Sequence, residues 1–221
     1  MLGFIFPEVC LICAENKGYI CNKCLKTFPR PCFKCFRCSR KNPFGLYCTS
    51  CRKKDLPDRI LAGLAYQGKL KDAIYQYKFE DAYKLSEDFS KSLIPIVKGI
   101  KNYKRYVLTF VPLSRSRERY RGYNQSKLLA DKVACYLKMQ VLDLLERKGQ
   151  DETQVTSKTK LARKRNIKGV FSVKKDIKIP ENIILIDDVV TTGATVEEAT
   201  RVLKRAGVKK VVVVALAMGA I

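Results

Sequence analysis

The segment at residues 184–195, Ile-Leu-Ile-Asp-Asp-Val-Val-Thr-Thr-Gly-Ala-Thr, constrains the fold of this chain more than any other. It starts in a short, β-branched apolar run over residues 183–186, as expected of a central parallel strand that is covered on both faces. Two carboxylates follow, and then a turn rich in hydroxyls with one glycine. This order of strand, acidic pair and polar turn predicts an α/β fold with a ligand at the carboxyl edge of a parallel sheet.

A helix is predicted to follow the polar turn. Thr195 and Glu198 have the spacing of a capping box, and apolar residues then repeat at helical period until Gly207. The first N–H groups of a helix lack partners within it and the dipole there is positive, so this end of a helix binds phosphate. The residues predicted to hold a phosphate are Thr191, Thr192, Gly193, Ala194 and Thr195.

The acidic pair, Asp187 and Asp188, stands where the strand is predicted to end. Its carboxylates can accept hydrogen bonds from the vicinal hydroxyls of a ribose and help to hold a hydrated Mg²⁺. The alternative is structural: the aspartates only end a strand and the threonines only cap a helix. The complete string, however, resembles the phosphoribosyl pyrophosphate (PRPP) signature of type I phosphoribosyltransferases. That resemblance implies a PRPP site in which Asp187 and Asp188 take the catalytic positions.

A second apolar strand, over residues 107–111, leads into Ser114 and Arg115. In a doubly wound sheet its end opens onto the same edge as the acidic pair. A turn bearing Ser114 and Arg115 there can hold pyrophosphate. Asn124 is then a candidate cap for a helix over residues 124–137. For residues 121–125, two interpretations stay equal: a role in the ligand site, and a capped helix with a solvated arginine face.

Nine of the ten cysteines lie in the first 51 residues, mostly as Cys-x-x-Cys pairs. Two such pairs complete one tetrahedral site, because Zn²⁺ takes four thiolates at about 2.3 Å. Four pairs therefore predict two structural zinc sites, which supply folding energy to a module too small for its own core. The simplest assignment is sequential, with Cys10, Cys13, Cys21 and Cys24 in the first site and Cys35, Cys38, Cys48 and Cys51 in the second.

Other assignments of the cysteines stay open. Cys32 and Cys35 also have the Cys-x-x-Cys spacing, a cross-braced arrangement is compatible with the pairs, and so is a metal-free or redox role. The run of cysteines at 32, 35 and 38 lacks the rest of an iron–sulfur motif. The absence of histidine excludes a catalytic zinc site built on imidazole. Cys135, in an apolar helical segment, is expected to be a buried thiol.

The formal net charge of +23 attracts polyanions. Basic residues are dense at 115–121 and 158–168, and in the cysteine region they alternate with aromatic residues. Cations that follow a backbone and aromatics that stack on bases favour single-stranded nucleic acid as a partner. The alternative is a solubility surface with the aromatics in a small core. The aromatic residues in question are Phe33, Phe36, Phe44 and Tyr47, and the basic ones are Lys34, Arg37, Arg40 and Lys41.

Composition divides the chain into a cysteine-rich zinc-binding module over residues 1–56 and a phosphoribosyltransferase-like domain over residues 57–221, joined by the linker Leu56-Pro57-Asp58. The second part alternates strands with helices, which predicts a parallel sheet with right-handed crossovers and helices on both faces. The predicted strands cover residues 60–66, 107–111, 141–145, 183–186 and 211–216, and the predicted helices lie near residues 70–79, 85–100, 124–137 and 195–206.

Residues 149–169 lack convincing periodicity and contain Gln154, Arg163, Arg165 and Asn166. A segment of this kind is predicted to be a loop that closes over the ligand and excludes water, or else a disordered basic loop. The chain also lacks an apolar run of bilayer length and a signal peptide at its start. The protein is therefore expected in the cytoplasm.

Further motifs extend the resemblance over most of the chain. Together with the cysteine ribbon and the PRPP string, they resemble the ComF family, although Tyr123 stands where that family commonly has phenylalanine. The resemblance implies a type I phosphoribosyltransferase fold, a PRPP site, and the handling of incoming single-stranded DNA during natural transformation beside a DNA-translocating helicase. The motifs are Tyr66-x-Gly68-x-Leu70, Lys78-Phe79, Val111-Pro112-Leu113, Arg121-Gly122-Tyr123-Asn124-Gln125, Thr153-Gln154, Arg165-Asn166 and Gly169-x-Phe171.

Three functions are compatible with these residues. The first is a PRPP-binding, single-stranded-DNA-binding protein of DNA uptake. The second is a phosphoribosyltransferase of nucleotide salvage, for which no base-reading constellation is evident, although residues 59–102 could furnish one. The third is a zinc-ribbon interaction protein whose phosphoribosyl site acts as a sensor. The motifs predict the class of ligand and leave catalysis undecided.

Overall fold

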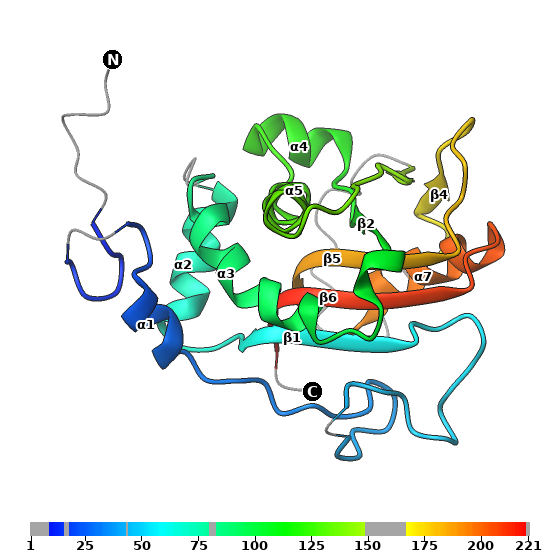
Figure 1. Cartoon of the computed structure of the whole chain (residues 1–221), viewed down its shortest axis with the longest axis horizontal. Coiled ribbons are helices and arrows are strands. Elements are labelled where there is room, and N and C mark those ends of the chain that lie inside the picture. Colours follow the sequence, from blue (N-terminus) through cyan, green and yellow to red (C-terminus); the bar gives the residue numbers. More distant parts are fainter. Residues whose placement is uncertain (1–8, 16–17, 43, 80–82, 149–166, 220–221) are drawn as a thin grey trace.

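The computed structural model describes residues 9–15, 18–42, 44–79, 83–148 and 167–219. At its centre lies a four-stranded sheet in the order β1-β6-β5-β2, in which all neighbouring strands are parallel (Figure 1). The predicted parallel sheet is confirmed. Its strands are β1 (Arg59–Ala65), β2 (Val107–Phe110), β5 (Asn182–Val190) and β6 (Lys210–Met218).

Both faces of the sheet are covered, which explains why β6 is apolar after Lys210 and why β5 is apolar over residues 183–186. Alternate residues of β5 point to opposite faces. Ile184 and Ile186 belong to the core on one face, and Ile183 and Leu185 to the core on the other. The sheet therefore separates two hydrophobic cores.

Helices pack on each face, as predicted. On one face lie α2 (Lys69–Phe79), α3 (Leu85–Lys98) and α5 (Gln125–Leu137), together with the short α1 (Asn22–Thr27). On the other face lies α7 (Ala194–Arg205), whose residues Val196, Ala199 and Leu203 enter the second core. The predicted helical repeat of Val196, Ala199, Leu203 and Ala206 is confirmed for the first three residues, whereas Ala206 is exposed and caps the helix. Gly207 follows the helix with a positive φ of 108°.

Two local predictions fail. The predicted strand over residues 141–145 is reduced to a single bridge between Val141 and Leu108, after which the chain leaves the sheet. Instead, β3 (Leu145–Arg147) pairs antiparallel with β4 (Phe171–Val173) in a separate two-stranded sheet. The sequence also did not reveal α4 (Arg115–Arg121), because its surface is polar on all sides and gives no periodic signal. A 3₁₀ turn covers Tyr103–Arg105.

The cysteine region is divided between the two faces of the sheet. Cys10, Cys21 and Cys24 lie in the core beside α3, whereas Cys35 lies in the core beside α7. The chain on either side of Cys35 follows the outer edge of β1 (Figure 1), where Ala65 N donates to Pro29 O at 2.8 Å and Ile60 N to Gly45 O at 2.7 Å. The domain boundary between residues 56 and 57 stays a prediction.

The segment predicted to close over the ligand lies mostly outside the described residues. Residues 149–166 are not described, and these include Thr153, Gln154, Arg163, Arg165 and Asn166. Within the described ranges, no helix has both the length and the apolar character needed to cross a membrane.

Candidate functional site

The acidic pair lies inside β5 and not after it. The strand continues to Val190, which pairs with Met218 of β6. The neighbouring strand β2 ends beside this point, because Val111 N donates to Ile186 O at 3.0 Å. The ends of β5 and β2 therefore share one edge of the sheet, as predicted for a doubly wound fold.

Asp187 is a buried carboxyl, with 7% of the residue exposed. One of its oxygens accepts hydrogen bonds from Ser126 Oγ at 3.2 Å and from Asp188 N at 2.9 Å. Burial, with the adjacent Asp188 carboxylate, raises the pKa of Asp187 to about 7. This group therefore changes its charge near neutral pH. Ser126 was not predicted as a partner of Asp187, since it lies 61 residues earlier in the sequence.

Asp188 forms an ion pair with Lys78, whose Nζ lies 2.9 Å from Oδ2. Lys78 stands in the last turn of α2. A cation at this distance neutralises the carboxylate in the absence of a ligand. Lys78 is part of the motif Lys78-Phe79, but no pattern in the sequence indicates Asp188 as its partner.

The segment 121–125 fixes the end of α2. Tyr123 Oη donates to the Tyr77 carbonyl, and Gln125 Nε2 donates to the Lys78 carbonyl at 3.4 Å. The Arg121 guanidinium stacks over a ring at the end of α2, with 4.5 Å from its carbon to the Phe79 centroid. These contacts hold Lys78 where it meets the acidic pair, so the motif supports the site through α2. Asn124 caps α5 as predicted, accepting from Lys127 N at 3.2 Å.

The turn after β5 is narrow. Gly193 is the N-cap of α7, with a φ of 76° that favours glycine. The predicted capping box of Thr195 and Glu198 is wrong, because the helix already begins at Ala194, and Glu198 Oε1 instead accepts from Gly169 N at 2.8 Å. A cavity of about 30 Å³ lies within this turn. It is lined by Asp187, Val189, Val190, Thr191, Thr192, Gly193, Ala194, Thr195 and Val196.

The structure thus brings the five predicted phosphate-binding residues and Asp187 to one small cavity. We call the segment 191–195 the phosphate loop. Backbone N–H groups at the start of α7 face no earlier helical turn, which is the arrangement that binds a phosphate.

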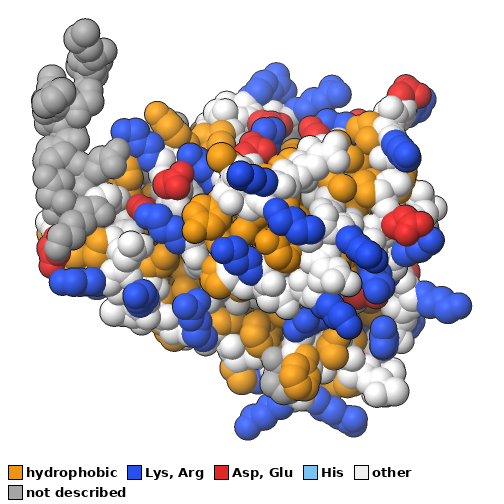
Figure 2. Space-filling view, in the orientation of Figure 1, with side chains coloured by type: hydrophobic (Ala, Val, Ile, Leu, Met, Phe, Trp, Pro, Cys, Tyr) orange, Lys and Arg blue, Asp and Glu red, His pale blue; other side chains and the backbone are white. Residues whose placement is uncertain are grey.

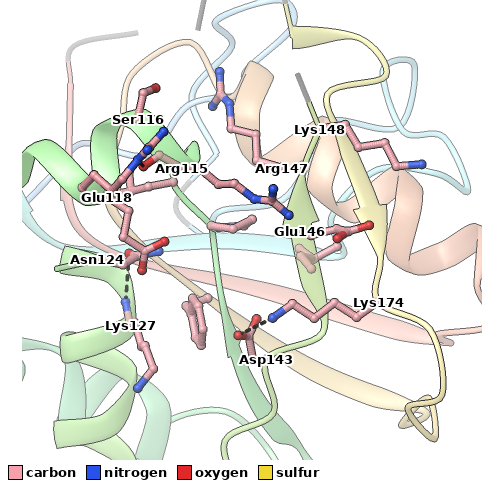
Figure 3. A pocket seen from close by; sticks show the side chains of 15 residues that line it. Arg115, Ser116, Glu118, Asn124, Lys127, Asp143, Glu146, Arg147, Lys148 and Lys174 are labelled. Carbon is pink, nitrogen blue, oxygen red and sulfur yellow. Dashed lines mark hydrogen bonds and ion pairs between the residues drawn. The ribbon is translucent and has the colours of Figure 1, made fainter. Parts of the chain in front are cut away.

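The turn after β2 is built differently. Ser114 is buried and caps α4, its hydroxyl accepting from Arg117 N at 3.4 Å. Arg115 is the first residue of α4 and reaches into a cavity of about 930 Å³ between α4 and β3 (Figure 3). Of the two residues predicted to face pyrophosphate, Arg115 lines an open cavity and Ser114 shapes the turn.

The large cavity is basic. Among the described residues that line it, six are cationic and three are acidic. Lys174 is paired with Asp143 at 2.6 Å (Figure 3). The excess of positive charge favours an anionic ligand. The cations are Arg115, Arg119, Lys127, Arg147, Lys148 and Lys174, and the acids are Glu118, Asp143 and Glu146.

The cysteines form two tetrads in sequential order. In each, the four sulfurs lie within 4.8 Å of one another, and Cys32 belongs to neither. The sulfurs of Cys13 and Cys21 are 3.8 Å apart, which matches the edge of about 3.8 Å of a tetrahedron with 2.3 Å metal–sulfur bonds. The first tetrad is Cys10, Cys13, Cys21 and Cys24, and the second is Cys35, Cys38, Cys48 and Cys51.

None of the ten cysteines, all of which the structure describes, forms a disulfide. Free thiols at these distances fit structural zinc, which takes four thiolates in a closed site. The expectation for Cys135 is wrong: it is exposed, because Val133, Ala134 and Leu137 form the buried face of α5.

The aromatic residues of the cysteine region are mostly packed. Phe36 and Tyr47 are buried, so they cannot stack on bases, and for them the core interpretation is correct. Phe44 is 63% exposed. Phe33 is half-buried, so Phe44 is the one exposed ring of the four aromatic residues predicted to stack on bases.

Exposed aromatic side chains gather instead at the end of α2. Tyr75, Phe79 and Tyr83 are all exposed. The rings of Tyr75 and Phe79 lie 4.9 Å apart, and Tyr83 lies 6.4 Å from Tyr123. We call these three exposed residues the aromatic patch. The patch adjoins Lys78 and therefore the acidic pair.

Comparison with known proteins agrees with this architecture. The model of the phosphoribosyl transferase domain matches residues 124–220. The competence protein ComFC of Streptococcus pneumoniae is 29% identical over 208 residues, covering 91% of this chain and 88% of that protein. The DNA utilization protein YhgH of Escherichia coli is 30% identical over 214 residues, covering 91% and 92%.

Among solved structures, that of the allosteric regulatory enzyme of purine biosynthesis aligns at 16% identity with a TM-score of 0.41, over 61% of this chain and 26% of that one. The fold itself follows from the matched domain and from the parallel sheet with helices on both faces. The PRPP string lies toward the end of β5, and ComFC and YhgH each match about nine-tenths of the chain. The chain therefore belongs to the ComF family of phosphoribosyltransferase-like proteins.

Proposed function

We propose that this protein binds PRPP at the shared edge of β5 and β2 and acts on single-stranded DNA in DNA uptake. The single observation that carries the proposal is the convergence of the phosphate loop, the acidic pair and Arg115 at one edge of the sheet. Relatives named competence protein and DNA utilization protein support the role in DNA uptake.

The parts of PRPP would bind at different points along this edge, according to their charge. The phosphate loop would bind the 5′-phosphate through the N–H groups at the start of α7. Asp187 and Asp188 would accept hydrogen bonds from the ribose hydroxyls. The pyrophosphate would extend toward Arg115 and the basic cavity after β2.

Mg²⁺ fits the donors at the end of β5. Asp187 and Asp188 supply carboxylate oxygens, which are the ligands that Mg²⁺ takes in proteins, often through bound water. When bound, the ion would neutralise charge on the pyrophosphate. Lys78 holds Asp188 in the unliganded protein and would give up part of this contact to the cation.

Titration calorimetry with PRPP and Mg²⁺ tests this site. The Asp187→Asn, Asp188→Asn double variant should lose affinity, and the matched control Glu181→Gln, which changes an exposed acidic residue paired with Lys209, should keep it. Unchanged affinity in the double variant contradicts the assignment. Pyrophosphate release measured with free bases and with single-stranded DNA then separates a salvage transferase from a binding protein.

Single-stranded DNA fits the outer surface. Lys and Arg side chains are spread over the face shown in Figure 2 and outnumber acidic ones there, which provides a general attraction for phosphates. The aromatic patch, with Arg121 against Phe79, offers rings on which bases stack. The proposed route of a strand therefore passes beside the acidic pair.

Fluorescence anisotropy with an oligo-dT strand tests this part. The Tyr75→Ala, Phe79→Ala variant should bind about 10-fold more weakly, whereas Phe44→Ala, at an equally exposed ring away from the patch, should bind normally. Affinity should also fall steeply with salt. Equal affinity for all three proteins, or no dependence on salt, removes the DNA proposal.

Following the family resemblance, we place this action in the cytoplasm, beside a DNA-translocating helicase.

A further inference from the structure

The segment that carries the second cysteine tetrad contacts the phosphate loop through Phe36. Phe36, between Cys35 and Cys38, is 3% exposed and packs under Gly193, where an added Cβ would lie 2.8 Å from the Phe36 ring. Phe36 shares the second core with Val190 and Val196, which flank the loop. The ring therefore supports the loop from the core side and does not fill the ligand side.

Two further residues beside the cysteines hold the first turn of α7. Tyr47 Oη donates to Glu197 Oε1 at 2.9 Å, and Arg37 Nη2 lies 3.8 Å from Glu197 Oε2. Glu197 N in turn donates to Gly193 O at 2.9 Å. The turn that presents N–H groups to a phosphate is thus held by residues adjacent to Cys35 and Cys48.

The position of the Glu197 carboxylate matters for anion binding. A carboxylate in the first turn of a helix is attracted to the same N–H groups that bind a phosphate, and it repels a phosphate placed there. Tyr47 and Arg37 hold this carboxylate, only 6% of whose side chain is exposed, in the second core. The cysteine segment therefore keeps a competing anion away from the phosphate loop.

The first tetrad lacks this connection. It lies in the core on the opposite face of the sheet, where Ile20 N donates to Asp88 of α3 at 2.9 Å. Each tetrad consists of two Cys-x-x-Cys pairs whose four sulfurs lie within 4.8 Å of one another, yet the two tetrads support different elements. This difference supplies an internal control.

We propose that the second tetrad, through Phe36, Arg37 and Tyr47, positions the phosphate loop, so that affinity for a phosphoribosyl ligand depends on metal in the second tetrad and not in the first. Segments this short rarely hold a conformation without their metal. Losing it would release Phe36 from Gly193 and remove the contacts of Tyr47 and Arg37 with the Glu197 carboxylate. The ligand named here rests on the proposed function, whereas the ordering of the loop does not.

The test compares Cys38→Ser with Cys13→Ser, which changes a cysteine of the first tetrad that is also exposed. Zinc content should fall by one equivalent in each variant. Hydrogen exchange of amides at 191–197 should accelerate at least 10-fold in Cys38→Ser and stay unchanged in Cys13→Ser, and PRPP affinity by calorimetry should fall only in Cys38→Ser. Equal effects of the two variants on the loop overturn the proposal.

A second pair of variants keeps both tetrads intact, because loss of a ligand can unfold its whole segment. Phe36→Ala should accelerate exchange at 191–197 and weaken PRPP binding about 10-fold, while zinc content and exchange in α3 stay unchanged. Phe36→Leu should restore most of both properties, because an apolar side chain of similar reach still fills the space under Gly193. Phe36→Ala with a normal loop overturns the proposal.

Failure of the proposed function can be told apart from failure of this inference. If the wild-type protein binds no PRPP but exchange in the phosphate loop still responds only to the second tetrad, the ligand is wrong and the positioning role stands. If the wild-type protein binds PRPP and all four variants bind it equally, the positioning role is wrong and the ligand stands.

Discussion

The ends of β5 and β2 lie side by side on one edge of the sheet, yet they are opposites. The end of β5 is acidic and narrow, with Asp187 buried in a cavity of about 30 Å³. The end of β2 is basic and wide, opening into a cavity of about 930 Å³. Under the proposed function, the narrow end would select its part of the ligand by hydrogen bonds and shape, and the wide end by charge. The difference teaches that the parts of a ligand bound here should be separable by experiment.

The largest expected effect concerns the narrow end. In the Asp187→Asn, Asp188→Asn variant, affinity for both PRPP and ribose 5-phosphate should fall at least about 100-fold, because each lost charged hydrogen bond costs about 1.5–3 kcal/mol. Calorimetry with the two ligands measures this. A loss confined to PRPP would show that the acidic pair serves the pyrophosphate and not the ribose.

The next effect concerns pH. Since the folded-state pKa of Asp187 is raised to about 7, the folded protein binds more protons than the unfolded chain between about pH 4 and pH 7, and stability falls as pH rises through this window. Asp187→Asn removes this cost, so its gain in unfolding free energy over wild type should be roughly 2–3 kcal/mol larger at pH 8 than at pH 5.

Urea unfolding of the zinc-loaded protein at the two pH values measures this difference. Both proteins carry the same cysteine sites, so the contribution of these sites to stability cancels. Asp143→Asn, at the wide end and exposed to solvent, is the control and should show no such change. A flat difference between Asp187→Asn and wild type would mean that the carboxyl at the narrow end is ionised at pH 5.

A smaller effect is expected at the wide end. Arg115→Ala should weaken PRPP binding about 10-fold and leave ribose 5-phosphate binding unchanged, because only PRPP carries a pyrophosphate for the guanidinium to bind. Arg105→Ala, in the exposed 3₁₀ turn, is the matched control. An equal loss of affinity for both ligands would contradict the proposal that the wide end binds the pyrophosphate and the narrow end binds the rest of PRPP.

The smallest effect tests the connection between the two ends. Tyr123 follows α4 and reaches α2 through its hydroxyl. Tyr123→Phe, the residue common in the family, should lower the unfolding free energy by about 1 kcal/mol, measured by urea unfolding. PRPP affinity should change less than about 3-fold, since Gln125 still holds the Lys78 carbonyl. A large loss of affinity would show that the hydroxyl itself sets the position of Lys78.

The sequence was informative where a local pattern determines the structure. The strand, acidic pair and glycine turn before α7 were recognisable because their chemistry is contiguous, and Asn124 was recognisable as a cap because capping depends on three residues. The sequential tetrads followed from the spacing of the pairs. For the parallel sheet, alternation of strands and helices was sufficient.

Sequence reasoning failed where a contact joins distant segments. No pattern near Lys78 in the sequence indicates its ion pair with Asp188, and none near Phe36 indicates its contact with Gly193. Phe36 therefore looked like a base-stacking residue until its burial was known. The helix α4 was missed for a different reason. Ser114 and Gly122 are good signals for its two ends, but the polar helix between them has no apolar face and so gives no periodic pattern.

The pairing of β1 with β6 joins the first and last strands of the described chain, with Arg59 opposite Val212. During synthesis, β1 leaves the ribosome long before β6, and an apolar strand with open edges recruits other chains. The segment that carries the second tetrad is already present and bonds to the outer edge of β1. Early metal loading would thus protect the nascent strand, and we expect zinc-starved cells to accumulate this protein in aggregates formed through β1.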